Sequence, residues 1–189
     1  MPRNSGRKSL QEPRQISHTA VTVDTGRVGK RRIVRLPRLD DLTAEVERIT
    51  LAAVAGKVRS LGNWSPAQAI WHIGKLIELS FDGFPFRYRR SPKWAIRAIR
   101  LLSWRWLIAL AFRPGFRNPP EAAILEPDAS LTLDVATAYF RQQIARIRGG
   151  ERMTQECSID GPYSHEQWVY IHLRHAELHL SFLALDGTV

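Results

Sequence analysis

Residues 164–180 read SHEQWVYIHLRHAELHL, and they carry the strongest helix signal of the chain. Ser164 followed three positions later by Gln167 is a capping-box signature, which marks the beginning of a helix. Apolar residues then recur at the 3.6-residue helical period until Asp186-Gly187, a pair that ends helices. The pattern therefore predicts an amphipathic helix from residue 164 to about residue 185.

Similar signals occur upstream of this stretch. Ser65-Pro66 marks another helix start, because serine caps a helix and proline fits its first turn. Asp82-Gly83 stops that helix, and Gly149-Gly150 stops a later one. The helices predicted upstream of residue 164 are 41–61, 66–81, 92–112 and 131–147.

The expected fold class is all-α, a four-helix bundle with an extra basic helical excursion. No hairpin signal and no fixed repeat occurs in the 189 residues. The single cysteine, Cys157, excludes an intrachain disulfide and a multi-cysteine zinc ribbon. No apolar run reaches the ~18 residues of a transmembrane helix. Residues 1–37 also lack the apolar core of a secretory signal, so the chain is expected to be cytoplasmic.

Positive charge is concentrated in two segments. Residues 1–38 contribute +8 and residues 87–117 contribute +9, which leaves −7 for the rest of a chain whose total is +10. Residues 1–30 mix basic residues with Gly, Ser and Pro, so they are expected to form a disordered or extended arm before a helical domain over 31–189. A solvated basic arm raises the net charge without implying a nucleic-acid partner.

Two histidines lie on the same side of the predicted 164–185 helix. At about 100° per residue, His175 and His179 are about 40° apart around the helix and about 6 Å apart along it. Trp168 and Phe182 fall in the same sector, so the pair faces the core. Buried imidazoles need partners. Either each ring hydrogen-bonds to a core group, or both rings bind one metal ion.

His72 is the candidate third ligand, because it is the one histidine of the predicted 66–81 helix and its helical neighbours are mostly apolar. One histidine from this helix and a pair from an antiparallel helix form a three-histidine site with positions open for water or substrate. His172 lies about 10.5 Å along the axis from His179, too far to share an ion. We expect His172 to support or border the site instead.

Several ordered motifs resemble the DinB/YfiT-like superfamily of metalloenzymes, and most closely a branch described as a domain of unknown function. The motifs are Trp64-Ser65-Pro66, Ile70-Trp71-His72-Ile73 and HLRHAELHL over 172–180, accompanied by Arg31-Arg32, residues 81–85 and Pro119-Pro120. The likeness covers about residues 31–185. It implies an up-down-down-up four-helix bundle, often dimeric. It also implies a divalent metal, commonly zinc, nickel or iron, held at the positions of His72, His175 and His179.

The resemblance implies a metal-activated water or thiol, since some members are hydrolases or thiol S-transferases that use low-molecular-weight thiols. Zinc and a small-molecule substrate are therefore the expected cofactor and partner. No catalytic residue is assigned, because Gln68, Lys75 and Glu78 lie near His72 and none is better placed than the others. Cys157 has acidic neighbours that disfavour a thiolate, so it is not expected to be a nucleophile.

The segment 87–117 departs from compact members of the superfamily and supplies an alternative function. It carries Trp94, Trp104 and Trp106 among nine basic residues and no acidic one. Aromatic residues among arginines stack on bases, and basic amphipathic helices lie on anionic lipid. The alternative is therefore a nucleic-acid or membrane-surface binding protein with a structural metal. The plainer interpretation is that the tryptophans pack on the bundle while the arginines are solvated.

Overall fold

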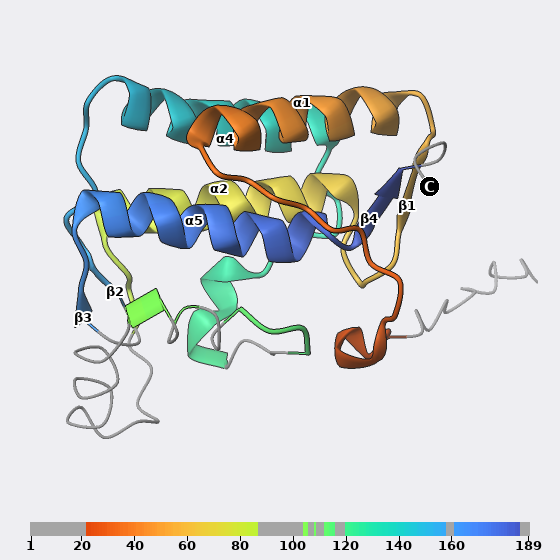
Figure 1. Ribbon diagram of the computed structural model, residues 1–189, viewed down its shortest axis with the longest axis horizontal. Coiled ribbons are helices and arrows are strands. Elements are labelled where there is room, and N and C mark those ends of the chain that lie inside the picture. The colour runs from red at the N-terminus through yellow and green to blue at the C-terminus, as the bar shows by residue number, and fades with distance from the viewer. Residues whose placement is uncertain are drawn as a thin grey trace, which may run out of the picture.

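The computed structural model describes residues 22–86, 104–105, 108, 112–115, 120–157 and 161–185, and its fold is mainly α (Figure 1). The long helices are α1 (Leu39–Val54), α2 (Pro66–Asp82), α4 (Leu133–Arg148) and α5 (His165–Leu180). Short 3-10 turns occur at η1 (Thr25–Arg27) and η2 (Pro120–Leu125). Strand β1 (Val58–Ser60) pairs antiparallel with β4 (Leu183–Leu185), and β2 (Glu156–Cys157) with β3 (Gly161–Pro162).

The long helices form two layers. Figure 1 shows α1 and α4 in one layer and α2 and α5 in the other, with η2 beyond α2 and α5. Within the described residues, no helix is both long and apolar enough to cross a membrane. The mainly helical class expected from the sequence is confirmed.

The two helices that carry the candidate histidines begin at capping boxes. The Ser65 hydroxyl accepts from the Gln68 amide N–H, and the Gln68 side chain accepts in return from the Ser65 N–H. Ser164 and Gln167 make the same pair of bonds at the start of α5. Each box satisfies two N–H groups that a helix start leaves free, so both starts lie where the sequence predicted them.

Two predicted helices end earlier than expected. Helix α1 stops at Val54 rather than at residue 61, because Gly56 takes a left-handed φ of 69° and turns the chain into β1. Helix α5 stops at Leu180, because residues 183–185 extend to pair with β1. Strands β1 and β4 are far apart in sequence, so they leave no hairpin signal, whereas the short β2–β3 pair is local and was not predicted.

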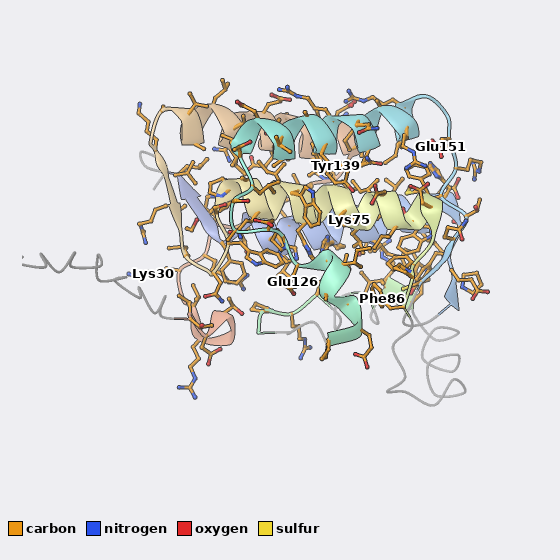
Figure 2. All side chains as sticks on the ribbon, turned by 180° about the vertical axis from the view of Figure 1, so that it is seen from behind. Lys30, Lys75, Phe86, Glu126, Tyr139 and Glu151 are labelled. Carbon is orange, nitrogen blue, oxygen red and sulfur yellow. The ribbon has the colours of Figure 1, made fainter. Side chains whose placement is uncertain are left out.

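One apolar core lies between the helical layers. Its fully buried members include Leu42, Val46, Ile49, Ile70, Ile73, Ile77, Phe140, Trp168 and Leu180. Gly74 lets α2 and α4 approach closely, because a Cβ there would lie 3.1 Å from the Tyr139 ring and 3.3 Å from the Phe140 Cα. Figure 2 shows Tyr139 extending from α4 toward α2.

The N-terminal segment is attached to the end of α5. Arg32 donates to the carbonyls of Leu180 and Leu183 and forms an ion pair with Glu45. Of the predicted arm, residues 1–21 lie outside the described residues. Val23 pairs through its backbone N–H and C=O with the Asn63 side chain, so this part of the arm contacts the helical domain.

The predicted 92–112 helix lies mostly outside the described residues. Trp104 packs edge-on against Tyr170 at 5.1 Å between ring centroids, and Ile108 is a buried member of the main core. The described parts of this segment thus pack on the helices.

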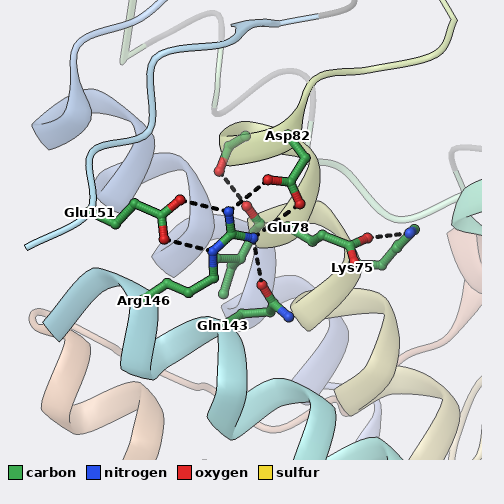
Figure 3. A network of polar contacts seen from close by, with 8 residues as sticks. Lys75, Glu78, Asp82, Gln143, Arg146 and Glu151 are labelled. Atoms are coloured by element: carbon green, nitrogen blue, oxygen red, sulfur yellow. Dashed lines mark hydrogen bonds and ion pairs between the residues drawn. The ribbon is translucent and has the colours of Figure 1, made fainter. Parts of the chain in front are cut away.

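An ion network joins the ends of α2 and α4 (Figure 3). Arg146 donates to both carboxylate oxygens of Asp82, at 2.6 and 3.1 Å, and to both of Glu151, at 2.7 and 2.8 Å. Its guanidinium also lies 4.2 Å from the centroid of the Phe81 ring. Lys75 and Glu78 form a separate ion pair on the same face of α2.

We expect Arg146→Ala to lower the free energy of unfolding by about 1–3 kcal/mol, because it removes charge-assisted bonds to two carboxylates at once. Urea unfolding followed by circular dichroism measures the loss. Arg141→Ala is the matched control, since Arg141 is more exposed and its ion pair within the described residues is with Glu47. Equal losses in the two variants would contradict the special role given to Arg146.

Candidate metal centre

Three histidines from two helices meet at one point. His175 Nε2 lies 3.1 Å from His72 Nε2 and 3.0 Å from His179 Nε2. One ring nitrogen from each residue lies within 4.8 Å of the other two. His72 comes from α2 and the other two from successive turns of α5. The structure therefore brings together the three histidines that the sequence singled out.

The spacing of these nitrogens is close to that of metal ligands. Zinc–nitrogen bonds of about 2.0–2.1 Å at tetrahedral angles place ligand nitrogens about 3.3 Å apart. The two contacts of His175, at 3.0 and 3.1 Å, are slightly shorter than this, and the third pair of nitrogens lies within 4.8 Å. The cluster found among the described residues consists of histidines alone, without a carboxylate or thiolate. Three such ligands leave at least one coordination position open.

The hydrogen bond of His72 fixes which of its nitrogens is available. His72 Nδ1 lies 2.7 Å from the Leu125 carbonyl oxygen, which only accepts, so Nδ1 carries the proton and donates it. His72 Nε2 therefore presents its lone pair to the cluster. Metal-bound histidines commonly donate their other N–H to a carbonyl in this way.

Hydrogen bonding alone leaves His175 unsatisfied. With its proton on Nδ1, the His175 Nε2 lone pair faces that of His72, and the buried N–H has no partner among the described residues. With its proton on Nε2, the buried Nδ1 becomes an acceptor without a partner there. A cation among the three Nε2 atoms accepts all three lone pairs at once. The residues present therefore fit a metal ion.

The electrostatic surroundings keep all three rings neutral. Burial lowers the pKa of His72 to about 4, although the Leu125 carbonyl partly opposes the shift. Burial, followed by the neighbouring imidazoles, also lowers the pKa values of His175 and His179 well below the usual value of 6.5. Neutral imidazoles have the free lone pairs that metal binding requires.

Aromatic side chains border the cluster. The Trp64 ring stacks on His179, with centroids 5.1 Å apart and planes 24° apart, and lies 4.5 Å from His72. The Phe112 ring lies 5.2 Å from His175. These apolar walls lower the local dielectric, which strengthens electrostatic interactions at the site.

Other candidates from the sequence lie outside the cluster. The Lys75 amino group pairs with Glu78, and the Gln68 amide reaches the Asp128 carbonyl. Cys157 lies in β2, away from the three histidines in the fold. The sequence did not place the Leu125 carbonyl or Phe112 beside the histidines, although Phe112 belongs to the basic aromatic segment 87–117. A backbone acceptor 53 residues from His72 leaves no motif, so no sequence signal was available for it.

Comparison with protein families gives one finding. Residues 29–185 match a family model described as "Protein of unknown function (DUF1569)". No curated protein and no solved structure matches the chain.

We expect the metal-free protein to lose stability as the pH falls from about 7 to about 5. Folded His72 has a pKa of about 4, below the 6.5 of an ordinary histidine, so protons bind the unfolded chain first. The contribution of neutral His72 to the free energy of unfolding is complete above pH 6.5 and declines as the pH falls toward 4. The slope approaches about 1.4 kcal/mol per pH unit for each such histidine. Urea unfolding at several pH values measures it.

His72→Asn is the matched control for this pH dependence. The asparagine amide can still donate to the Leu125 carbonyl, but it does not titrate. The variant should therefore show a shallower dependence than the parent over the same range. Identical slopes in the two proteins would contradict the assignment to His72.

Proposed function

The chain belongs to the DUF1569 family of proteins of unknown function, and because that description names no reaction, we propose its function from the site itself. The proposed function is that of a divalent-metal-dependent enzyme, with His72, His175 and His179 as the protein ligands. The observation that carries the proposal is the convergence of three Nε2 atoms while His72 Nδ1 is held by the Leu125 carbonyl.

Zinc is the ion that we propose, with nickel and iron as the alternatives. Neutral imidazole ligands suit all three ions. A three-histidine set with an open position is also the arrangement of catalytic zinc sites. The cluster among the described residues contains no carboxylate and no thiolate. Neutral histidines therefore leave the positive charge of the ion uncompensated. Such a site favours an anionic or readily deprotonated fourth ligand.

The proposed reaction class is hydrolysis or thiol transfer on a small-molecule substrate. When bound, a divalent ion lowers the pKa of a coordinated water or thiol and so supplies a nucleophile near neutral pH. The chain contributes the rest of the site. The Leu125 carbonyl orients His72, while Trp64 and Phe112 limit access of bulk water.

The motifs that resemble the DinB/YfiT-like superfamily support a finer statement about the fold. We infer that α1, α2, α4 and α5 form a four-helix bundle of the DinB-like type, with residues 31–189 as the domain. The support is the ordered set of motifs between residues 31 and 185, together with the positions of the histidines on α2 and α5.

The alternative function of nucleic-acid or membrane-surface binding receives less support. In the 87–117 segment, Trp104 contacts Tyr170 and Phe112 contacts His175, so these aromatic rings pack on the helical domain. Trp94 and Trp106 lie outside the residues whose side chains the structure describes. These contacts agree with the interpretation that the aromatic residues of the segment pack on the bundle.

Elemental analysis tests the metal proposal directly. We expect near-stoichiometric zinc, nickel or iron in the purified, untagged parent and its loss in the His175→Ala/His179→Ala double variant. His165→Asn is a control on the same helix, because His165 accepts from the Met153 N–H outside the cluster. A parent that contains no metal, even after incubation with all three ions, would refute the proposal.

Tryptophan fluorescence provides a second test. Trp64 lies against two of the proposed ligands, so binding of paramagnetic Co²⁺ or Ni²⁺ should quench its emission. Trp64→Phe should still bind the ion by elemental analysis while losing most of the quenching. Quenching that persists unchanged in Trp64→Phe would place the bound ion elsewhere.

A further inference from the structure

His172 is a buried titratable residue of α5 that the proposed function does not use. It is 1% exposed, and its ring stacks on Trp168 with centroids 5.5 Å apart. Its Nε2 lies 3.0 Å from the Ser80 hydroxyl oxygen. Its Nδ1 has no hydrogen-bond partner among the described residues, and the same is true of His175 Nδ1. Two buried, unpaired nitrogens therefore lie on successive turns of one helix.

The contacts of Ser80 fix the tautomer of His172. The Ser80 hydroxyl lies 2.6 Å from the Ile77 carbonyl oxygen and donates its proton there. Its oxygen is then the acceptor for His172 Nε2–H. A neutral imidazole with its proton on Nε2 has an unprotonated Nδ1, so His172 Nδ1 is a buried acceptor. Burial keeps the ring neutral, because it lowers the pKa of His172 to about 3.

Metal coordination fixes the opposite tautomer at His175. A neutral histidine that binds an ion through Nε2 carries its proton on Nδ1. His175 Nδ1 is then a buried donor, while His172 Nδ1 is a buried acceptor. The Cβ atoms of residues three apart on a helix are about 5–6 Å apart. The unpaired donor and the unpaired acceptor are thus complementary and on neighbouring turns.

We propose that His172 is the outer hydrogen-bond partner of the metal ligand His175, through one buried water between their Nδ1 atoms. A water accepts from His175 Nδ1–H and donates to His172 Nδ1, which removes both unpaired groups. The inference rests on the proposed metal site. His172 is a positioning residue and not a ligand. It does for His175 what the Leu125 carbonyl does for His72.

Cobalt binding tests this role, because Co²⁺ can replace zinc and gives an absorption spectrum that reports ligand geometry. The comparison uses the full chain as the parent, His172→Leu and His172→Asn. Leucine fills the space without an acceptor, whereas the asparagine side-chain oxygen lies near the position of Nδ1 and retains one. We expect His172→Leu to bind Co²⁺ about 10–100-fold more weakly than the parent and to show an altered spectrum. His172→Asn should bind Co²⁺ almost as tightly as the parent.

A second measurement does not depend on how well the variants fold. In the zinc-loaded parent labelled with ¹⁵N-histidine, NMR should show a proton on Nε2 of His172 and on Nδ1 of His175. The His175 proton should exchange slowly with solvent because it is buried and bonded. The opposite tautomer at His172 would overturn the proposal.

The outcomes separate this inference from the proposed function. Equal Co²⁺ affinity and equal spectra in the parent and His172→Leu would overturn the role of His172 while leaving the metal site intact. Failure of the parent to bind Co²⁺, zinc, nickel or iron would overturn both. The melting temperatures of the metal-free variants show whether any loss of Co²⁺ affinity comes from general unfolding.

Discussion

Two buried imidazoles, His72 and His175, meet the partly buried ring of His179 between α2 and α5, and the packing around them has to accommodate this polar cluster. Desolvation keeps the rings neutral, and neutral rings at this spacing leave lone pairs that face one another. The surrounding structure limits how the rings can turn, since a carbonyl holds His72 and the Trp64 ring covers His179. The cluster therefore lowers the stability of the metal-free protein, and a bound cation would offset this loss.

The parts of this site that the sequence predicted are those that depend on local spacing. The serine–glutamine boxes place the starts of α2 and α5, and the 3.6-residue period then sets the direction of His72 and of the pair at His175 and His179. The direction of each histidine follows from its spacing to apolar residues of the same helix, such as Trp168 for the pair on α5, and this spacing is a local property of the sequence.

The parts that the sequence did not predict depend on contacts between distant residues. The Leu125 carbonyl reaches His72 through a backbone atom, which any residue type can supply. Likewise, Val58 continues the apolar period of α1. The backbone nevertheless turns at Gly56, so Val58 lies in β1 and pairs with Leu185. Tertiary pairing here outweighs the local pattern, so helix ends were less predictable than helix starts.

The distribution of the histidines between α2 and α5 has a consequence for synthesis. His72 and His175 are 103 residues apart, so a ribosome adding about 5–20 residues per second makes the second about 5–20 seconds after the first. Until α5 emerges, the nascent chain offers a single imidazole from α2, which is a weak ligand for any ion. Assembly of the three-histidine set therefore has to wait for α5, and an ion would bind a chain in which α1, α2 and α4 are already made.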